Sequence, residues 1–167
     1  GYVLLGRSGV TATPTMQGLI IKYDQNGNLS WDKTWGGTGT ANYLRELILT
    51  SDGGFAAVGY SNSFNGSTGT INDAVLVKFN SSGTASWSTY WGSSSADDKA
   101  WSLVESPGGG YVISGQTNSY GTLNGFTDAF IAKFNSSGTL SWSRTFGTNT
   151  GDDFGWAVIN TIDGAYA

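Results

Sequence analysis

Oxygen-bearing side chains are the groups in this sequence with the clearest capacity for chemistry. The 167 residues include ten aspartates and two glutamates, and there is neither histidine nor cysteine. A Ser-His-Asp triad, a thiol nucleophile and a zinc site built from imidazole or thiolate are therefore excluded within the chain. What remains is the chemistry of carboxylates, hydroxyls and amides, which covers calcium binding, sugar binding and carboxylate-based hydrolysis.

Paired aspartates recur along the chain at one interval. Asp97 and Asp98 form the first pair, and Asp152 and Asp153 form the second, 55 residues later. Ca²⁺ takes about six to eight oxygen ligands, so these four carboxylates are the candidate metal ligands and Ca²⁺ is the candidate cofactor. The wider set of candidate ligand-binding residues is Asp73, Asp97, Asp98, Tyr120, Asn124, Phe126, Asp128, Asp152 and Asp153.

Three interpretations of these residues stay open. Asp and Asn side chains often cap turns and strand ends by accepting hydrogen bonds from nearby backbone N–H groups, which requires no ligand. Calcium binding would use the same oxygens as ligands, and sugar binding would add the aromatic rings as stacking platforms. A carboxylate pair that hydrolyses a polysaccharide is disfavoured, because the aspartates repeat whereas catalysis singles out one position in an array.

A repeat of about 55 residues places these side chains. Residues 73–87 (DAVLVKFNSSGTASW) return as residues 128–142 (DAFIAKFNSSGTLSW), and a more divergent copy occupies residues 18–31. The same spacing of 56 and then 55 residues separates Trp31, Trp87 and Trp142, and also Lys22, Lys78 and Lys133, and Gly36, Gly92 and Gly147.

Each copy of the repeat predicts four short β-strands. In the second copy they cover residues 74–79, 84–91, 99–106 and 111–117, and apolar side chains alternate with polar ones along them. Gly- and Asn-rich turns separate the strands, and no stretch has a sustained helical period. The predicted fold class is therefore all-β, with three tandem repeats that form four-stranded antiparallel blades of a β-propeller.

The blade pattern predicts where side chains lie. Successive connections of a meander alternate between its two ends, so the short turns share one face and the long loops, with the candidate site residues, share the other. Trp31, Trp87 and Trp142 are predicted to pack in the core between blades. Trp101 and Trp156 recur opposite Arg45 and are also predicted to belong to the core.

A resemblance to a known family rests on two blocks. Residues 78–84 (KFNSSGT), and residues 52–55 (DGGF) followed by 59–63 (GYSNS), resemble the bacterial and archaeal β-propeller repeat family of the SBBP type and its relatives. The resemblance covers essentially the whole chain and implies the propeller fold. The family has no single activity, and many of its members are secreted or lie at the cell surface, which implies an extracellular or cell-surface location for this chain.

The repeats divide the chain into residues 1–16, as the end of a preceding blade, residues 17–72 and 73–127, as two repeats, and residues 128–167, as a partial third. Propellers close with about four to eight blades, so three blades leave sheet edges exposed. The expected partners are further repeats of a longer chain, which the duplicated phase of the two ends favours, or copies that associate through blade edges.

Charge and short motifs narrow the function. The net charge of −4 argues against nucleic-acid binding, and no apolar run is long enough for a transmembrane helix. Candidate glycosylation sequons lie at Asn28, Asn65, Asn80 and Asn135. The sequence thus predicts a non-catalytic structural or interaction module. The alternative is a carbohydrate-binding propeller, assisted by Ca²⁺, and a polysaccharide-acting enzyme ranks third.

Overall fold

The computed structural model describes residues 1–9, 16–36, 41–63, 71–93, 95–121 and 125–167. In these ranges the chain forms eleven β-strands and no helix, so the described part contains no helix that could cross a membrane. The strands are β1 (Tyr2–Gly9), β2 (Met16–Tyr23), β3 (Leu29–Trp35), β4 (Asn42–Leu49), β5 (Phe55–Ser61), β6 (Asp73–Phe79), β7 (Ala85–Trp91), β8 (Asp98–Glu105), β9 (Tyr111–Thr117), β10 (Asp128–Phe134) and β11 (Leu140–Phe146).

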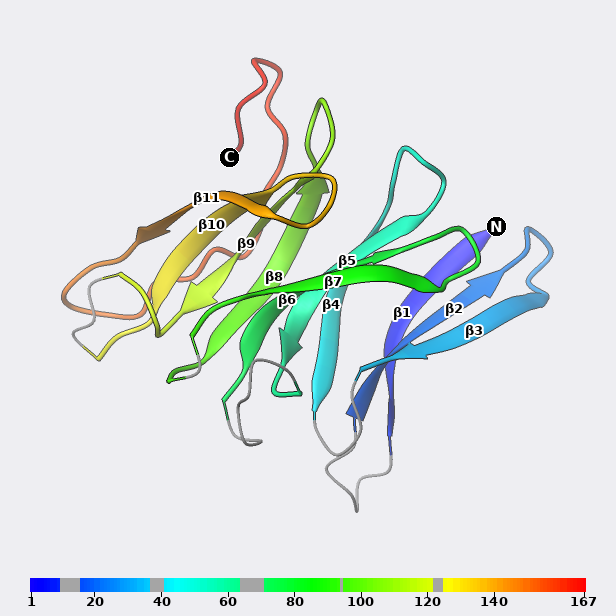
Figure 1. The fold of residues 1–167 in the computed structure, drawn as a ribbon, viewed down its shortest axis with the longest axis horizontal. Coiled ribbons are helices and arrows are strands. Elements are labelled where there is room, and N and C mark those ends of the chain that lie inside the picture. Colours follow the sequence, from blue (N-terminus) through cyan, green and yellow to red (C-terminus); the bar gives the residue numbers. More distant parts are fainter. Residues whose placement is uncertain (10–15, 37–40, 64–70, 94, 122–124) are drawn as a thin grey trace.

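The strands form three antiparallel sheets that follow one another along the chain. The first sheet has the order β1-β2-β3, the second β4-β5-β6-β7 and the third β8-β9-β10-β11. The sheets lie side by side, with the N-terminus at one end of the row and the C-terminus at the other (Figure 1). The all-β prediction and the antiparallel pairing are confirmed. The three sheets do not close on one another within the described residues.

The sheets group the strands differently from the sequence repeats. The sequence suggested that the long loop before Asp73 leads from one blade to the next, but β5 and β6 on either side of that loop pair with each other. The chain instead changes sheet through the short segment 92–97, between β7 and β8. Near the N-terminus, β1 pairs with β2. Loop length does not reveal where one sheet ends and the next begins, because sheet membership depends on which strand edges face each other.

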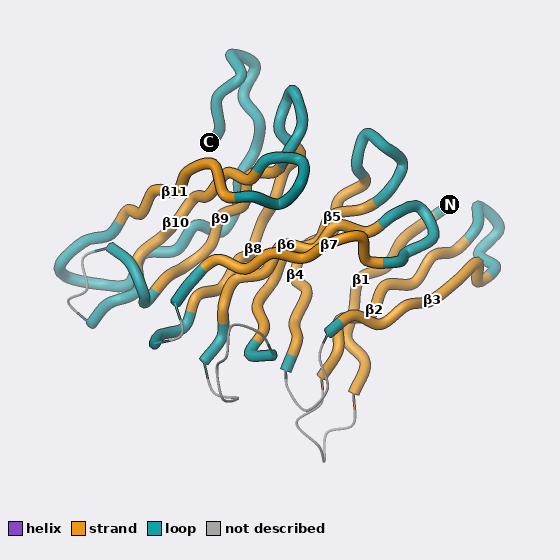
Figure 2. Tube along the Cα trace, viewed as in Figure 1, coloured by secondary structure: helices purple, strands orange, loops and turns teal. Residues whose placement is uncertain are grey.

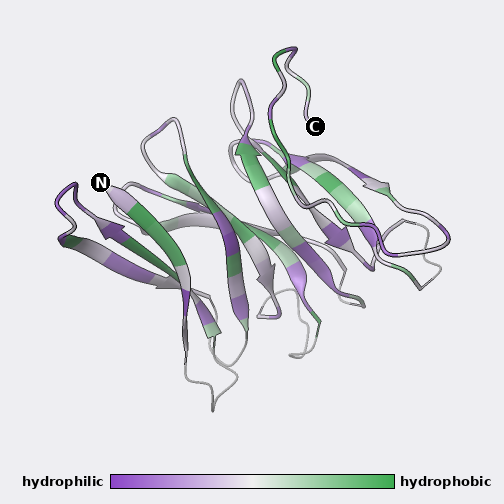
Figure 3. Ribbon diagram, turned by 180° about the vertical axis from the view of Figure 1, so that it is seen from behind, coloured by the Kyte–Doolittle hydropathy of each residue, from purple (hydrophilic) through white to green (hydrophobic). Residues whose placement is uncertain are grey.

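The core consists of two apolar layers, one on each face of the second sheet. Successive residues of β5 and β6 point to opposite faces, as the pleat requires. Phe55, Ala57, Val75, Val77 and Phe79 pack against Ile20 and Trp35 of the first sheet, whereas Ala56, Val58, Ala74 and Leu76 pack against the third. Burial on both faces explains why these strands are nearly continuous apolar runs. Figure 3 colours the strands by hydropathy, with hydrophobic stretches in green.

The recurring tryptophans of the outer strands join neighbouring sheets. The ring of Trp31 meets that of Phe55 edge to face at 6.0 Å, and Trp87 meets Tyr111 in the same way at 5.8 Å. All three recurring tryptophans, Trp142 included, are half-buried. The predicted place between sheets is therefore confirmed for Trp31 and Trp87, whereas the ring of Trp142 lies 6.3 Å from that of Tyr166 in the segment after β11.

Trp101 and Trp156 were predicted to belong to the core, and this prediction is wrong. The ladder between β8 and β9 slips between Ala100 and Ser102, so Trp101 is the extra residue of a β-bulge. A bulge turns its side chain out of the regular alternation, and the Trp101 indole lies between the Arg45 guanidinium, 5.2 Å away, and Trp156, 5.6 Å away. Trp156 is 65% exposed.

Candidate functional site

The predicted site residues lie at the end of the sheets that carries the long connections. Short hairpin turns occupy the opposite end, so the predicted division into two faces holds (Figure 2). Asp73, Asp98 and Asp128 begin β6, β8 and β10, and all three are buried. Asp97 immediately precedes β8, and Asp152 and Asp153 occupy the matching position after β11.

Asp98 binds together the segments around it. Its Oδ1 accepts a hydrogen bond from Thr117 Oγ1 at 2.5 Å, and its Oδ2 accepts bonds from Ser119 Oγ at 2.5 Å and from the Ser93 N–H at 3.1 Å. Burial raises the pKa of the Asp98 carboxyl above its ordinary value, although these hydrogen bonds act in the opposite direction. The carboxyl therefore serves as an acceptor at the junction of three segments.

Asn42 occupies the place of Asp98 in the second sheet. Its Oδ1 accepts hydrogen bonds from Ser61 Oγ at 2.6 Å and Ser63 Oγ at 2.8 Å, and its Nδ2 donates to the Met16 carbonyl at 3.0 Å. Ser61 and Ser63 correspond to Thr117 and Ser119 in the third sheet. A neutral amide thus accepts the same hydrogen bonds as the carboxyl. This favours a structural role at this position, as a clamp that holds the loop, over a ligand-binding role that requires the negative charge.

Asp97, Asp152 and Asp153 also accept hydrogen bonds from the loops. Asp97 accepts hydrogen bonds from the N–H and Nδ2 of Asn72 and forms an ion pair with Lys99 at 2.9 Å. Burial acts to raise the pKa of Asp97, but these partners outweigh it and the pKa is lowered. Asp152 accepts a bond from the Thr127 N–H, and Asp153 one from the Thr148 N–H. Among the described residues, no three acidic side chains converge on one point.

The other predicted residues are spread over the loops. Tyr120 donates its hydroxyl hydrogen to the Gly92 carbonyl at 3.0 Å, and its ring lies 5.1 Å from that of Trp91. Phe126 is partly exposed next to the start of β10. Asn80 and Asn135 sit in exposed hairpin turns, where each Oδ1 accepts backbone hydrogen bonds, and Asn28 ends a similar turn held by Asp24. Asn65 and Asn124 lie outside the described residues.

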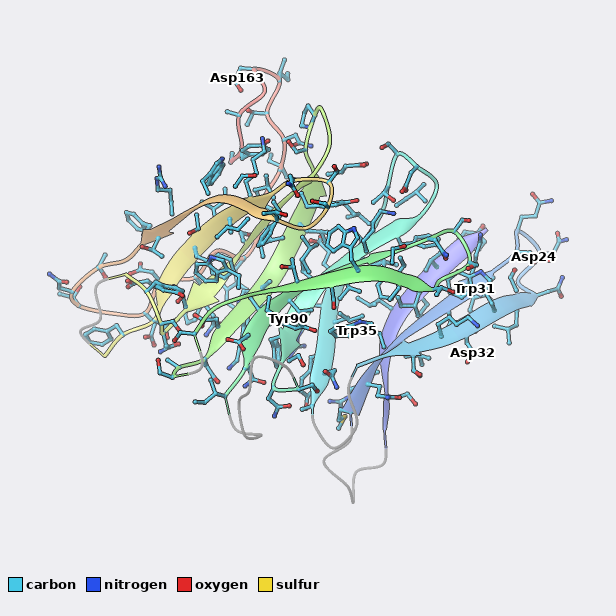
Figure 4. All side chains as sticks on the ribbon, viewed as in Figure 1. Asp24, Trp31, Asp32, Trp35, Tyr90 and Asp163 are labelled. Carbon is cyan, nitrogen blue, oxygen red and sulfur yellow. The ribbon has the colours of Figure 1, made fainter. Side chains whose placement is uncertain are left out.

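A cleft of about 560 Å³ opens between the outer strands β7 and β11. The second sheet contributes Tyr90 and Trp91, the third contributes Ser143, Arg144 and Thr145, and Tyr120 completes the lining from its loop. Figure 4 labels Tyr90 on β7. Only Tyr120 belongs to the set predicted from the sequence, because the two strands that form the cleft come from different sheets.

The cleft combines aromatic surface with one fixed positive charge. Tyr90 is partly buried, and burial raises its pKa to about 12, so its hydroxyl stays protonated. Tyr120 is 42% exposed and offers a ring face. Arg144 is exposed and holds itself to the Ser143 carbonyl through Nη1 at 2.7 Å, which leaves further guanidinium donors for a ligand.

The residues that line the cleft differ between repeats. The positions of Tyr90 and Arg144 are occupied by Thr34 and Thr89 one repeat earlier. At the corresponding positions of β3 and β7, Thr34 and Thr89 therefore provide neither the phenol nor the guanidinium. Lys33, Thr89 and Arg144 occupy one aligned position of the repeat, and the variation among them suggests packing or solvent contact rather than a shared site.

Comparison with protein-family models and with curated proteins finds no match for this sequence.

Proposed function

We propose that the chain is a section of an extracellular β-propeller that acts as a non-catalytic interaction module. The observation that supports the proposal is a contact that recurs one repeat later, first between the second and third sheets and then between the third sheet and the segment after β11. The Asp98 N–H donates to the Asn72 carbonyl at 2.7 Å, and one repeat later the Asp153 N–H donates to the Thr127 carbonyl at the same distance. A contact repeated with the period of the sequence fits a radial array, in which every unit meets the next in the same way.

The contacts of the aspartates argue against carboxylate catalysis. A glycoside hydrolase needs one acid and one base or nucleophile directed at the same bond. Here Asp98, Asp152 and Asp153 accept hydrogen bonds from loop backbone or hydroxyl groups, and Asn42 replaces Asp98 in the second sheet. The extracellular location rests on the family resemblance of the repeat.

Electron microscopy of the native material tests the architecture. Closed disks with a central channel are expected, since a radial array leaves its inner strands around an axis. Continuous fibres would contradict the propeller and would indicate a structural polymer built from the same sheets.

Carbohydrate binding is the second candidate function, and the cleft between β7 and β11 favours it. Ring faces bind sugars by stacking, and a guanidinium recognises a carboxylate through paired hydrogen bonds. Tyr120 and Arg144 supply these two groups next to the hydroxyls of Ser143 and Thr145. The expected ligand is therefore a glycan that carries an acidic sugar.

Arg144→Ala is expected to weaken glycan binding about tenfold to a hundredfold, because charge-assisted hydrogen bonds contribute about 1.5–3 kcal/mol each. A glycan array would identify the ligand, and calorimetry would compare the wild type with the variant. Lys33→Ala is the matched control, since Lys33 holds the same position on β3, away from the cleft. An array without any binder, or equal affinity of Arg144→Ala and wild type, would refute this candidate.

A further inference from the structure

Tyr120 joins the two sheets that form the cleft between β7 and β11. It lies in the connection between β9 and β10 of the third sheet, and its hydroxyl donates a hydrogen bond at 3.0 Å to the Gly92 carbonyl, which follows β7 of the second sheet. Its ring lies 5.1 Å from that of Trp91, which itself stacks on Phe130 at 4.0 Å. Phe130 and Trp91 are buried, whereas Tyr120 is partly exposed. A series of three rings thus leads from the core to the surface of the cleft.

A single buried hydroxyl fixes the backbone of Tyr120. Thr117 Oγ1 accepts hydrogen bonds from the N–H groups of Ser119 and Tyr120, both at 3.1 Å. These two bonds use both lone pairs of the hydroxyl oxygen, so the hydroxyl hydrogen needs an acceptor of its own. That acceptor is Asp98 Oδ1, at 2.5 Å. Because Thr117 is 0% exposed, bulk water does not compete for any of these bonds.

The same carboxyl fixes the partner of the Tyr120 hydroxyl. Asp98 Oδ2 accepts a hydrogen bond from the Ser93 N–H at 3.1 Å, and thereby holds the residue next to Gly92. It also accepts one from Ser119 Oγ at 2.5 Å, and Ser119 Oγ in turn accepts one from Ser93 Oγ at 2.9 Å. Both ends of the hydrogen bond between Tyr120 and Gly92 are therefore tied to one buried carboxyl.

The preceding copy of the repeat has the same support but a different ring. Ser61 Oγ takes the place of Thr117 Oγ1 and donates to Asn42 Oδ1 at 2.6 Å. The residue aligned with Tyr120 is Phe64, which has no hydroxyl and lies outside the described residues. The support is thus common to the two copies, whereas the hydrogen bond from the ring to the neighbouring sheet needs the hydroxyl of Tyr120.

We infer that Thr117, itself held by Asp98, is a positioning residue that fixes Tyr120 as the sugar-stacking platform of the cleft. A ring already held in its bound orientation loses little conformational freedom when a ligand binds, and this raises the affinity. In this arrangement Tyr120 contacts the face of a sugar ring, and Arg144 on the same cleft binds the carboxylate of the ligand. The identity of the ligand rests on the proposed glycan-binding function, whereas the positioning of Tyr120 does not.

Thr117→Val tests the positioning without any ligand. Valine has the shape of threonine but neither accepts nor donates a hydrogen bond, so the N–H groups of Ser119 and Tyr120 lose their acceptor. Hydrogen exchange of these two groups, measured by NMR, should become about three- to tenfold faster. Thr117→Ser keeps the hydroxyl and should restore the wild-type rates. Equal exchange rates in Thr117→Val and the wild type would overturn the inference.

A glycan array links the positioning to binding. The probe is a set of uronic-acid and sialic-acid oligosaccharides with their neutral counterparts. Thr117→Val and Tyr120→Phe should each raise the half-saturating protein concentration on the acidic glycans about three- to tenfold, and Thr117→Ser should leave it unchanged. Ser61→Ala is the matched control, because it removes the corresponding hydroxyl from the second sheet, at a residue that does not line the cleft. It should bind and exchange at Ser119 and Tyr120 as the wild type does.

The two measurements separate the positioning from the glycan function. Faster exchange and weaker binding in Thr117→Val, both reversed in Thr117→Ser, would support the inference. Faster exchange in a protein that binds no acidic glycan would overturn the glycan function and uphold the positioning of Tyr120. Unchanged glycan binding by Thr117→Val despite faster exchange would overturn the role of Tyr120 as a platform. An equal loss of binding in Ser61→Ala would also overturn it, because general destabilisation would then be the cause.

Discussion

Gly115→Ala is expected to lower the free energy of unfolding by about 3–4 kcal/mol. The new methyl group would lie within 3.0 Å of the Lys99 carbonyl oxygen, the Phe130 ring and Ala100 Cα. Two of these three atoms belong to the backbone of β8, where the bulge at Trp101 holds the strand against β9. Backbone atoms cannot rotate away as a side chain does, so the two strands would have to separate locally.

Urea unfolding followed by tryptophan fluorescence would measure this effect. Gly6→Ala provides the comparison, because it makes the same substitution at the same position of the repeat, where no inner strand approaches within the described residues. Its unfolding free energy should stay within about 0.5 kcal/mol of that of the wild type. Equal effects at Gly6 and Gly115 would contradict the role assigned to the bulged strand.

Asp98→Ala is expected to cost about 2–4 kcal/mol of stability, since it leaves one buried hydroxyl, one part-buried hydroxyl and a backbone N–H without their acceptor. Thr117, Ser119 and Ser93 all donate to this carboxyl. Asp98→Asn should cost much less, because Asn42 fulfils the same role in the second sheet through Oδ1. Equal instability of the asparagine and alanine variants would mean that the negative charge of Asp98 is required, and would contradict its role as a hydrogen-bond acceptor alone.

The pH dependence of stability should also differ between the wild type and Asp98→Asn. Burial raises the pKa of Asp98 in the folded state above its ordinary value of 3.8. A raised folded-state pKa contributes stability that is fully present below the ordinary pKa and is lost as the pH rises through the folded-state value. The stability of Asp98→Asn relative to the wild type should therefore increase from pH 4 upward, as urea titrations at several pH values would reveal. A constant difference would contradict the raised pKa.

The sequence predicted best those features that are decided locally. The turn at Asn80 is an example, because Asn80 Oδ1 accepts bonds from the Ser82 and Thr84 N–H groups while Gly83 adopts a positive φ of 78°. All of these residues are neighbours in the chain. The all-β fold class and the position of Trp31 and Trp87 between sheets were predictable for the same reason, since strand periodicity and turn residues repeat visibly.

The features that escaped prediction depend on contacts between distant segments. Trp101 reads as a regular strand residue, and only the slip in its pairing with β9 turns it outward against Arg45. Arg144 and Tyr90 are 54 positions apart and line one cleft because two sheets bring their outer strands together. The grouping of strands into sheets was also inaccessible, because a repeat reveals its period without revealing where a unit begins.

The placement of the core in two separate layers has a consequence for how the molecule opens. The second sheet has apolar layers on both faces, whereas the first and third sheets each share one of those layers. Detaching a terminal sheet breaks a single layer, while exposing the middle one breaks both. In an array whose members interact only with their neighbours, a sheet that shares one layer therefore opens more readily than a sheet that shares two. The cooperativity of unfolding therefore depends on the number of joined sheets, because each added sheet gives its neighbour a second apolar layer.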